Sequence, residues 1–279
     1  MKTAAGMHPA SAIGWSWKAS QDLLRWIRKG RFRRYLPVLF SWALGFGIWE
    51  IVGRSSSPFV FASFSDSVAA FWKLLENGIL FRHAKVSMQE LGIGFSIGAA
   101  IGITGGALAA FSRTFRDMTD HWITAFLSTP FAAIFPIFLV WFGLGLNSKI
   151  ALAVFASFMP VWINTHTGVI SVDRRLVEVT RAFGGNWLQA LRWVVLPWSL
   201  PSLIEGLRFG LSRAFLAVIV GELLASQAGL GFLINLSGAT LRIDNLLAAV
   251  MVVTGITIAL VEIMKLAQRV MVPWWEERA

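Results

Sequence analysis

The chain has 279 residues, of which 56% are hydrophobic and only 14% are charged, and its formal net charge at pH 7 is +10. A soluble domain of this length carries about a quarter charged residues, so the composition argues against a soluble enzyme. The chain has no cysteine, which excludes disulfides, thiolate metal sites and thiol catalysis.

The first 35 residues form a basic segment that contains eight of the 25 lysine and arginine residues. Tryptophan, leucine and isoleucine residues alternate with the basic ones between positions 15 and 27. This pattern indicates an amphipathic helix on the inner face of a membrane. A disordered basic tail fits residues 1–18 equally well. No small-residue cleavage site follows the next apolar run, so we expect no cleaved signal peptide.

Six continuously apolar segments follow, each about long enough to cross the ~30 Å hydrocarbon core of a bilayer. They predict an all-α polytopic membrane protein with about six transmembrane helices in a domain spanning residues 36–272, and a short tail at 273–279. The segments are Leu36–Val52, Leu91–Ala110, Trp122–Phe142, Ile150–Ile170, Trp198–Gly221 and Leu246–Met264.

The basic residues are distributed unequally between the two sides of this predicted bundle. Seventeen lie in segments on one side, six lie on the other, and two lie within the fifth segment. The positive-inside rule then places both termini in the cytoplasm. The net charge is therefore a topology signal, with anionic lipid and not nucleic acid as the expected partner.

Glycine recurs every four residues in the second segment, at Gly94, Gly98, Gly102 and Gly106. Such a stripe lets a second helix backbone approach closely, so we expect tight helix packing here. The spacing alone leaves open whether the second helix belongs to the same subunit. Gly206 and Gly210 repeat the pattern in the fifth segment.

No motif in the chain predicts a bound cofactor, a metal or a catalytic centre. The glycines do not form a dinucleotide fingerprint, because residue 97 is isoleucine, and GxxxxGK[ST] is absent. None of the four histidines has a partner at metal-ligand spacing. If the protein uses ATP and magnesium, we expect another chain to bind them.

A polar stretch at 173–197 interrupts the apolar segments between the fourth and fifth. Asp173 is positioned to cap a short helix, Gly184 and Gly185 to end it, and Asn186 to start a second one. Pro197 and Pro201 are expected to break the chain as it re-enters the membrane. The first helix carries apolar residues that nothing nearby covers, which favours a partner protein.

This hairpin resembles the cytoplasmic loop of binding-protein-dependent ABC transporter permeases. Their signature is Glu-Ala-Ala, three residues, Gly, nine residues, an aliphatic residue, one residue and Leu-Pro. Glu178, Gly184 and the pair Leu196–Pro197 match it, whereas Val179 and Thr180 replace the two alanines.

The resemblance extends over roughly residues 80–275 and points to the taurine, aliphatic sulfonate and nitrate branch. Trp141–Gly145, Gly221–Leu224 and Gly229–Gly231 look like that branch. The resemblance implies that two permease chains, most simply a homodimer, form a pore and that cytoplasmic ATP-binding subunits dock on the hairpins. It also implies a periplasmic binding protein that delivers a small anion, or a neutral vitamin precursor.

Several polar residues within the apolar segments are candidates for the transport pathway or its gates. Arg208 and Arg213 either face the path of an anion or hold the structure together, by an ion pair with Glu205 or by reaching the interface. The remaining candidates are Phe131, Asn164 and Glu222. A transporter driven by an ion gradient and a membrane enzyme remain as alternative functions.

Overall fold

The structure is a computed structural model that describes the backbone of residues 31–273 and the side chains from Pro37 to Pro273. The predicted interfacial helix in the first 30 residues, and the tail after residue 273, lie outside the described residues. Every regular element within 31–273 is a helix, which confirms the predicted all-α class. The chain divides into two compact units, Met1–Ser65 and Asp66–Ala279.

The first unit contains helix α2 (Arg31–Ser55) and the turn that follows it. The indole of Trp49 donates a hydrogen bond of 3.1 Å to the carbonyl of Ala62. The carboxylate of Glu50 accepts hydrogen bonds from the backbone and the hydroxyl of Ser65, at 2.9 and 2.8 Å. These bonds fold the turn back onto the last turns of α2.

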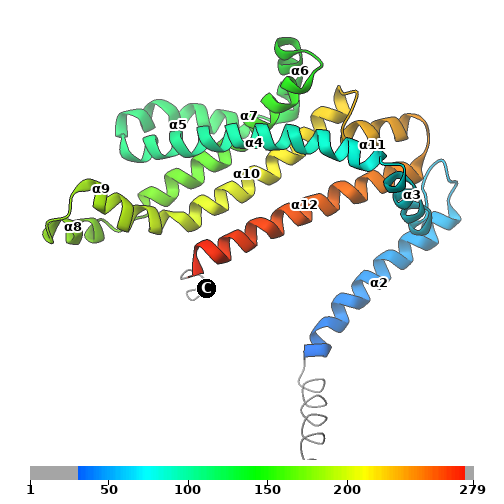
Figure 1. Cartoon of the computed structure of the whole chain (residues 1–279), viewed down its shortest axis with the longest axis horizontal. Coiled ribbons are helices and arrows are strands. Elements are labelled where there is room, and N and C mark those ends of the chain that lie inside the picture. The colour runs from blue at the N-terminus through cyan, green and yellow to red at the C-terminus, as the bar shows by residue number, and fades with distance from the viewer. Residues whose placement is uncertain (1–30, 274–279) are drawn as a thin grey trace, which may run out of the picture. The chain divides into compact units, whose positions relative to one another are not determined.

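The second unit is built around three long helices, α4 (Ile79–Phe111), α7 (Leu146–Ile170) and α10 (Leu196–Leu224). Helix α7 packs along both α4 and α10, which run beside it in Figure 1. The other elements from α3 onward are α3 (Phe64–Glu76), α5 (Arg113–Ser128), α6 (Phe131–Phe142), α8 (Arg174–Ala182), α9 (Trp187–Ala190), the π-helix η1 (Leu191–Val195), α11 (Leu230–Ala239) and α12 (Ile243–Met271).

Three helices in the described part of the chain are long and apolar enough to cross a membrane, namely α4, α7 and α12. The pair α5 and α6 would make a fourth span if the bent pair crosses as one unit. The predicted first and fifth spans fall on α2 and α10, which are not among these. In α10 the reason is charge, because every stretch of 18 residues includes at least three of its four charged residues.

The predicted span Trp122–Phe142 is wrong as a single straight helix. Helix α5 ends at Ser128, and α6 leaves it at an angle of 101°. Pro130 caps the start of α6, and Thr129 before it takes the extended conformation, with φ −82° and ψ 125°. A residue that precedes proline is sterically disfavoured from helical geometry, so the break occurs at this position.

The glycine stripe of α4 lies against α7 of the same chain. A β-carbon built on Gly94 would lie 2.6 Å from the β-carbon of Ala153, and one on Gly106 would lie 2.5 Å from the carbonyl oxygen of Trp162. Gly210 of α10 approaches α7 as closely, because a β-carbon there would lie 2.8 Å from the side chain of Val161. The glycines therefore allow the three backbones to approach closely.

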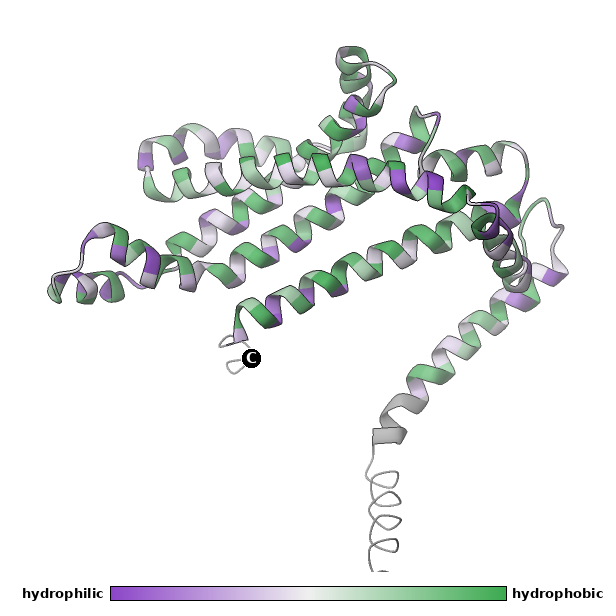
Figure 2. Cartoon of the chain, in the orientation of Figure 1, coloured by the Kyte–Doolittle hydropathy of each residue, from purple (hydrophilic) through white to green (hydrophobic). Residues whose placement is uncertain are grey.

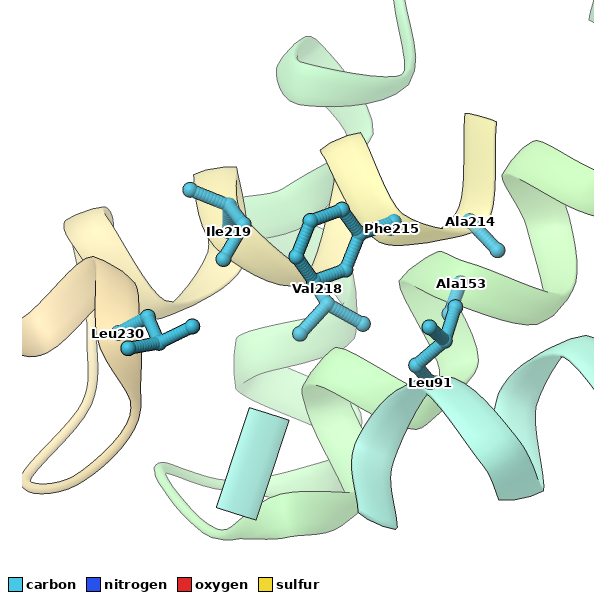
Figure 3. Close-up of a cluster of buried hydrophobic side chains, with 7 residues drawn as sticks. All are labelled: Leu91, Ala153, Ala214, Phe215, Val218, Ile219 and Leu230. Carbon is cyan, nitrogen blue, oxygen red and sulfur yellow. The ribbon is translucent and has the colours of Figure 1, made fainter. Parts of the chain in front are cut away.

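A buried apolar cluster joins α4, α7 and α10 to α11 (Figure 3). It consists of Leu91, Ala153, Ala214, Phe215, Val218, Ile219 and Leu230. Side chains of α12 between Val252 and Leu260 pack against it. The cluster fixes α10 and α11 beside the helices that form the sites described below.

We predict that Gly102→Val destabilises the described bundle, whereas Gly92→Val in the same helix does not. A β-carbon at Gly102 would lie 2.6 Å from Val161 and 2.7 Å from the carbonyl of Phe158, whereas nothing lies within 4 Å at Gly92. Overpacking of this kind costs about 1–3 kcal/mol. Thermal unfolding in detergent measures the difference, and equal midpoints for the two variants would contradict the close approach.

Candidate functional site

The hairpin at 173–197 begins and turns as its sequence suggests. The Asp173 carboxylate accepts a 2.9 Å hydrogen bond from the backbone of Arg175 at the start of α8. Gly184 ends this helix with φ +79°, a conformation that glycine adopts without strain. Asn186 and Gln189 then form a reciprocal capping box at the start of α9, with bonds of 2.8 and 2.9 Å.

The predicted break at Pro197 and Pro201 is wrong. The chain continues from α9 through the π-helix η1 into α10, and Pro197 stands in the first turn of α10. A proline has no backbone N–H to donate within a helix, and Pro197 stands where the hydrogen-bond pattern changes from the π-helix to the α-helix. The wider π-turn precedes this position, and Pro201 lies inside α10 without ending it. The hairpin is therefore joined to α10 by continuous helix.

The hairpin presents apolar side chains that the described chain leaves uncovered. No residue of α8 is buried, and Phe183 at its end is 89% exposed. Val179 and Leu188 are also exposed, and Glu178 lies among them on α8. Figure 2 shows polar and apolar residues mixed along α8 and α9. A surface of this kind suits a protein partner, since contiguous exposed apolar groups are unfavourable in water.

A cavity of about 240 Å³ opens between α5, α6, α7 and α10. We call it the central cavity. Phe131, Asn164 and Arg213 line it, so three of the five candidate pathway residues meet here. The full lining is Phe126, Leu127, Thr129, Phe131, Ala156, Met159, Pro160, Ile163, Asn164, Glu205, Phe209 and Arg213.

The two arginines of α10 have different surroundings. Arg208 forms an ion pair with Glu205, three residues earlier on the same helix, and does not line the cavity. Arg213 does line it, and among residues 37–273 it has no acidic partner within salt-bridge distance. The charge of Glu205 is thus offset by Arg208, and Arg213 gives the cavity a positive excess.

Glu222 lies apart from the central cavity, in a buried polar cluster where α4, α10 and α11 meet. It is 1% exposed and accepts a 2.6 Å hydrogen bond from the hydroxyl of Ser87 and a 2.7 Å bond from the backbone of Gly231. Gly229 passes so close that a β-carbon there would overlap the Glu222 carboxylate. Glu222 therefore positions the turn between α10 and α11.

Two further charged residues belong to this cluster, and the sequence analysis missed both. Lys149 is 2% exposed and donates hydrogen bonds of 2.9 and 3.0 Å to the carbonyls of Leu144 and Gly145. Glu90 is 1% exposed and faces Glu222, and its oxygens have no hydrogen-bond donor among the described residues. Each lies directly before one of the predicted apolar segments, Leu91–Ala110 or Ile150–Ile170, so the pattern places it outside the membrane. The only sequence signal for the buried cluster was a charged residue directly before an apolar segment.

We predict that Glu222→Ala lowers the free energy of unfolding by about 3 kcal/mol, because it leaves buried donors without an acceptor. Glu222→Gln keeps an oxygen for the Gly231 backbone and should lose less. Glu76→Ala, at an exposed position of α3, is the control. Chemical unfolding in detergent gives the comparison, and a Glu222→Ala variant as stable as the control would refute this role.

The sequence matches a family model and several relatives. Residues 102–277 match the model described as binding-protein-dependent transport system inner membrane component. The putative aliphatic sulfonates transport permease SsuC of Bacillus subtilis is 34% identical over 232 residues, covering 82% of this chain and 83% of the relative. The taurine transport permease TauC of Escherichia coli is 32% identical over 198 residues, with 71% and 72% covered.

Another relative carries a different substrate in its name. The riboflavin transport system permease RibX of Chloroflexus aurantiacus is 32% identical over 241 residues, covering 86% of this chain and 89% of the relative.

Two solved structures share the fold. A chain of the inward-facing MetNI methionine ABC transporter matches with a TM-score of 0.55 at 22% identity, covering 67% of this chain and 94% of that one. A chain of an amino acid ABC transporter with histidines matches with a TM-score of 0.57 at 18% identity, covering 71% and 97%. The family match covers more than half of the sequence, so the chain belongs to the binding-protein-dependent transport system inner membrane components, the permease subunits of ABC importers.

Proposed function

We propose that this permease moves a small organic anion inward by alternating access, with the hairpin at 173–197 as the lever that couples it to a partner ATPase. The main observation behind this proposal is that an exposed, partly apolar hairpin is joined to α10 without a break. A push on α8 is transmitted along η1 into α10, which lines the central cavity. Switching between inward-open and outward-open states requires a rigid connection between the ATPase docking site and the helices that line the transport path.

The proposed coupling residues are those of the loop signature, Glu178, Gly184, Gly185, Leu196 and Pro197. Gly184 sets the angle between α8 and α9 through its positive φ, and Gly185 leaves room for Thr180, whose carbonyl accepts a 2.9 Å bond from the Gly185 backbone. Leu196 and Pro197 carry the hairpin into α10. Glu178 offers an exposed carboxylate to the partner.

The central cavity supports an anionic cargo. Arg213 supplies a positive charge without an acidic partner, and Asn164 supplies an amide. Phe131 and the other apolar lining residues suit the carbon skeleton of a small molecule. Taurine, an alkanesulfonate, nitrate or an aromatic carboxylate has the required charge, and the names of the sulfonate and taurine relatives agree with this class.

A neutral vitamin precursor is the second candidate cargo, favoured by the similarity to the riboflavin permease. The largely apolar lining of the central cavity is compatible with it. The two cargo classes differ in their need for Arg213, because only an anion gains from its charge. An ion-gradient-driven carrier explains neither the hairpin nor the family match.

The proposed assembly contains two copies of this chain, two cytoplasmic ATP-binding subunits that hold ATP and magnesium, and a periplasmic binding protein. In this assembly only the partner subunits bind ATP and magnesium, and the permease chain itself binds no cofactor. Residues 36–272 form a domain of about six spans in the inner membrane, with α2 and α10 completing the set. Both termini lie in the cytoplasm, where residues 1–35 and 273–279 contact anionic lipid.

The coupling role predicts that a tagged chain isolated from native membranes in mild detergent brings an ATPase subunit with it. Glu178→Ala should weaken this association several-fold, and Gly184→Trp should abolish it, because a bulky residue at positive φ distorts the hairpin. Glu76→Ala, outside the hairpin, should retain the ATPase. Quantitative mass spectrometry of the eluates and ATP hydrolysis provide the readouts. An ATPase retained equally by all variants would exclude the hairpin as its docking site.

The anion path predicts that Arg213→Gln reduces uptake of radiolabelled taurine or alkanesulfonate in cells by at least about tenfold, the effect of losing roughly 1.4 kcal/mol of charge-assisted binding. Arg213→Lys should retain part of the uptake. The amount of co-purifying ATPase should stay at the wild-type level. Full uptake of an anion by Arg213→Gln would contradict the path, and full uptake of riboflavin instead would favour the neutral cargo.

A further inference from the structure

A second cavity, of about 420 Å³, lies where the hairpin meets the ends of α4, α5 and α7. We call it the base cavity. Its charged lining residues are Arg116 from α5 and Arg174, Glu178 and Arg181 from α8. Three guanidinium groups therefore border one space with a single carboxylate, and the lining has a positive excess.

These arginines lack strong partners of their own. Neither Arg174 nor Arg181 has an ion pair within the part of the chain that the structure describes. Arg116 is 3.7 Å from the carboxylate of Asp117, which is a long contact, and its side chain is only 30% exposed. Like charges around a shared cavity repel one another unless an anion is present. The planar guanidinium group is suited to phosphate oxygens in particular, which it can bind through two parallel hydrogen bonds.

The other side of the base cavity is apolar. Phe111 and Trp187 meet edge to face with their ring centroids 5.4 Å apart. Val169, Ile170 and Val195 complete this wall. Inorganic phosphate would use only the arginines, whereas a phospholipid would place its phosphate at the arginines and its glycerol and first acyl carbons against the apolar wall.

We infer that the base cavity binds a phosphate-bearing anion, and that an anionic phospholipid headgroup fits more of its lining than free phosphate does. Basic pockets at the cytoplasmic ends of transmembrane helices are suited to such headgroups. The inference rests on the proposed function only in placing the hairpin at the cytoplasmic face. A bound phosphate would join α8 to α5 through the arginines on both, so it would stiffen the hairpin that we propose as the lever.

The test uses the full-length chain in detergent and follows its thermal unfolding with three additives: dihexanoyl phosphatidylglycerol, dihexanoyl phosphatidylcholine and inorganic phosphate. We expect phosphatidylglycerol to raise the unfolding midpoint by about 3 °C or more and phosphatidylcholine to leave it unchanged. Arg116→Gln should lose at least half of this shift. Arg113→Gln, an exposed position of the same helix outside the base cavity, should keep it.

The additives separate the two sources of phosphate. A shift with phosphatidylglycerol alone supports a lipid site, and an equal shift with inorganic phosphate supports a site for a soluble anion. If Arg116→Gln does not fold, Arg181→Gln takes its place. No shift with either anion, or an unchanged shift in the arginine variants, overturns the inference.

The shift of the unfolding midpoint tests the base cavity independently of the coupling proposal, because the ATPase pull-down is a separate measurement. A wild-type chain that retains its ATPase without any anion shift would overturn the base-cavity inference alone. A normal anion shift in a chain that captures no ATPase would overturn the coupling role alone.

Discussion

The close approach of α4 and α10 to α7 is the contact on which the rest of the described bundle depends. Lipid is as apolar as the helices, so association in a membrane relies on packing and on small residues at the contact. Val161 of α7 is fully buried and lies close to both Gly102 of α4 and Gly210 of α10. Because these helices pack closely, the central cavity and the buried polar cluster both lie along α7 and α10.

The charged residues of the bundle differ in the groups that surround them, and the proposed transport role of Arg213 rests on this difference. Glu222 accepts hydrogen bonds from two elements of the chain's own fold, through Ser87 of α4 and Gly231 of α11. Arg208 is neutralised by Glu205. Arg213 alone among these faces a cavity without an acidic partner within the described residues. A charge left available beside a cavity fits a ligand, whereas a charge enclosed by donors fits a fixed turn.

The hairpin and the central cavity are mechanically linked through α10. The same helix begins at the hairpin, passes the central cavity and ends at the turn held by Glu222. In the proposed mechanism, a movement of α8 reaches the central cavity and the opposite end of α10 through this continuous helix. A π-turn is a common place for such adjustment within a helix, so η1 is also where the coupling could be tuned.

The sequence by itself determined the all-helical class, the family, the caps of the hairpin at Asp173 and Asn186, and the close contact of the glycine stripe. These features depend on composition or on residues within a few positions of one another. Only the folded structure shows that the stripe meets α7 of the same chain, that the helix continues through Pro197, and that Ser87 reaches Glu222 across 135 positions. It also decided the cavities, because their lining comes from helices far apart in sequence, and no local pattern encodes which helices become neighbours.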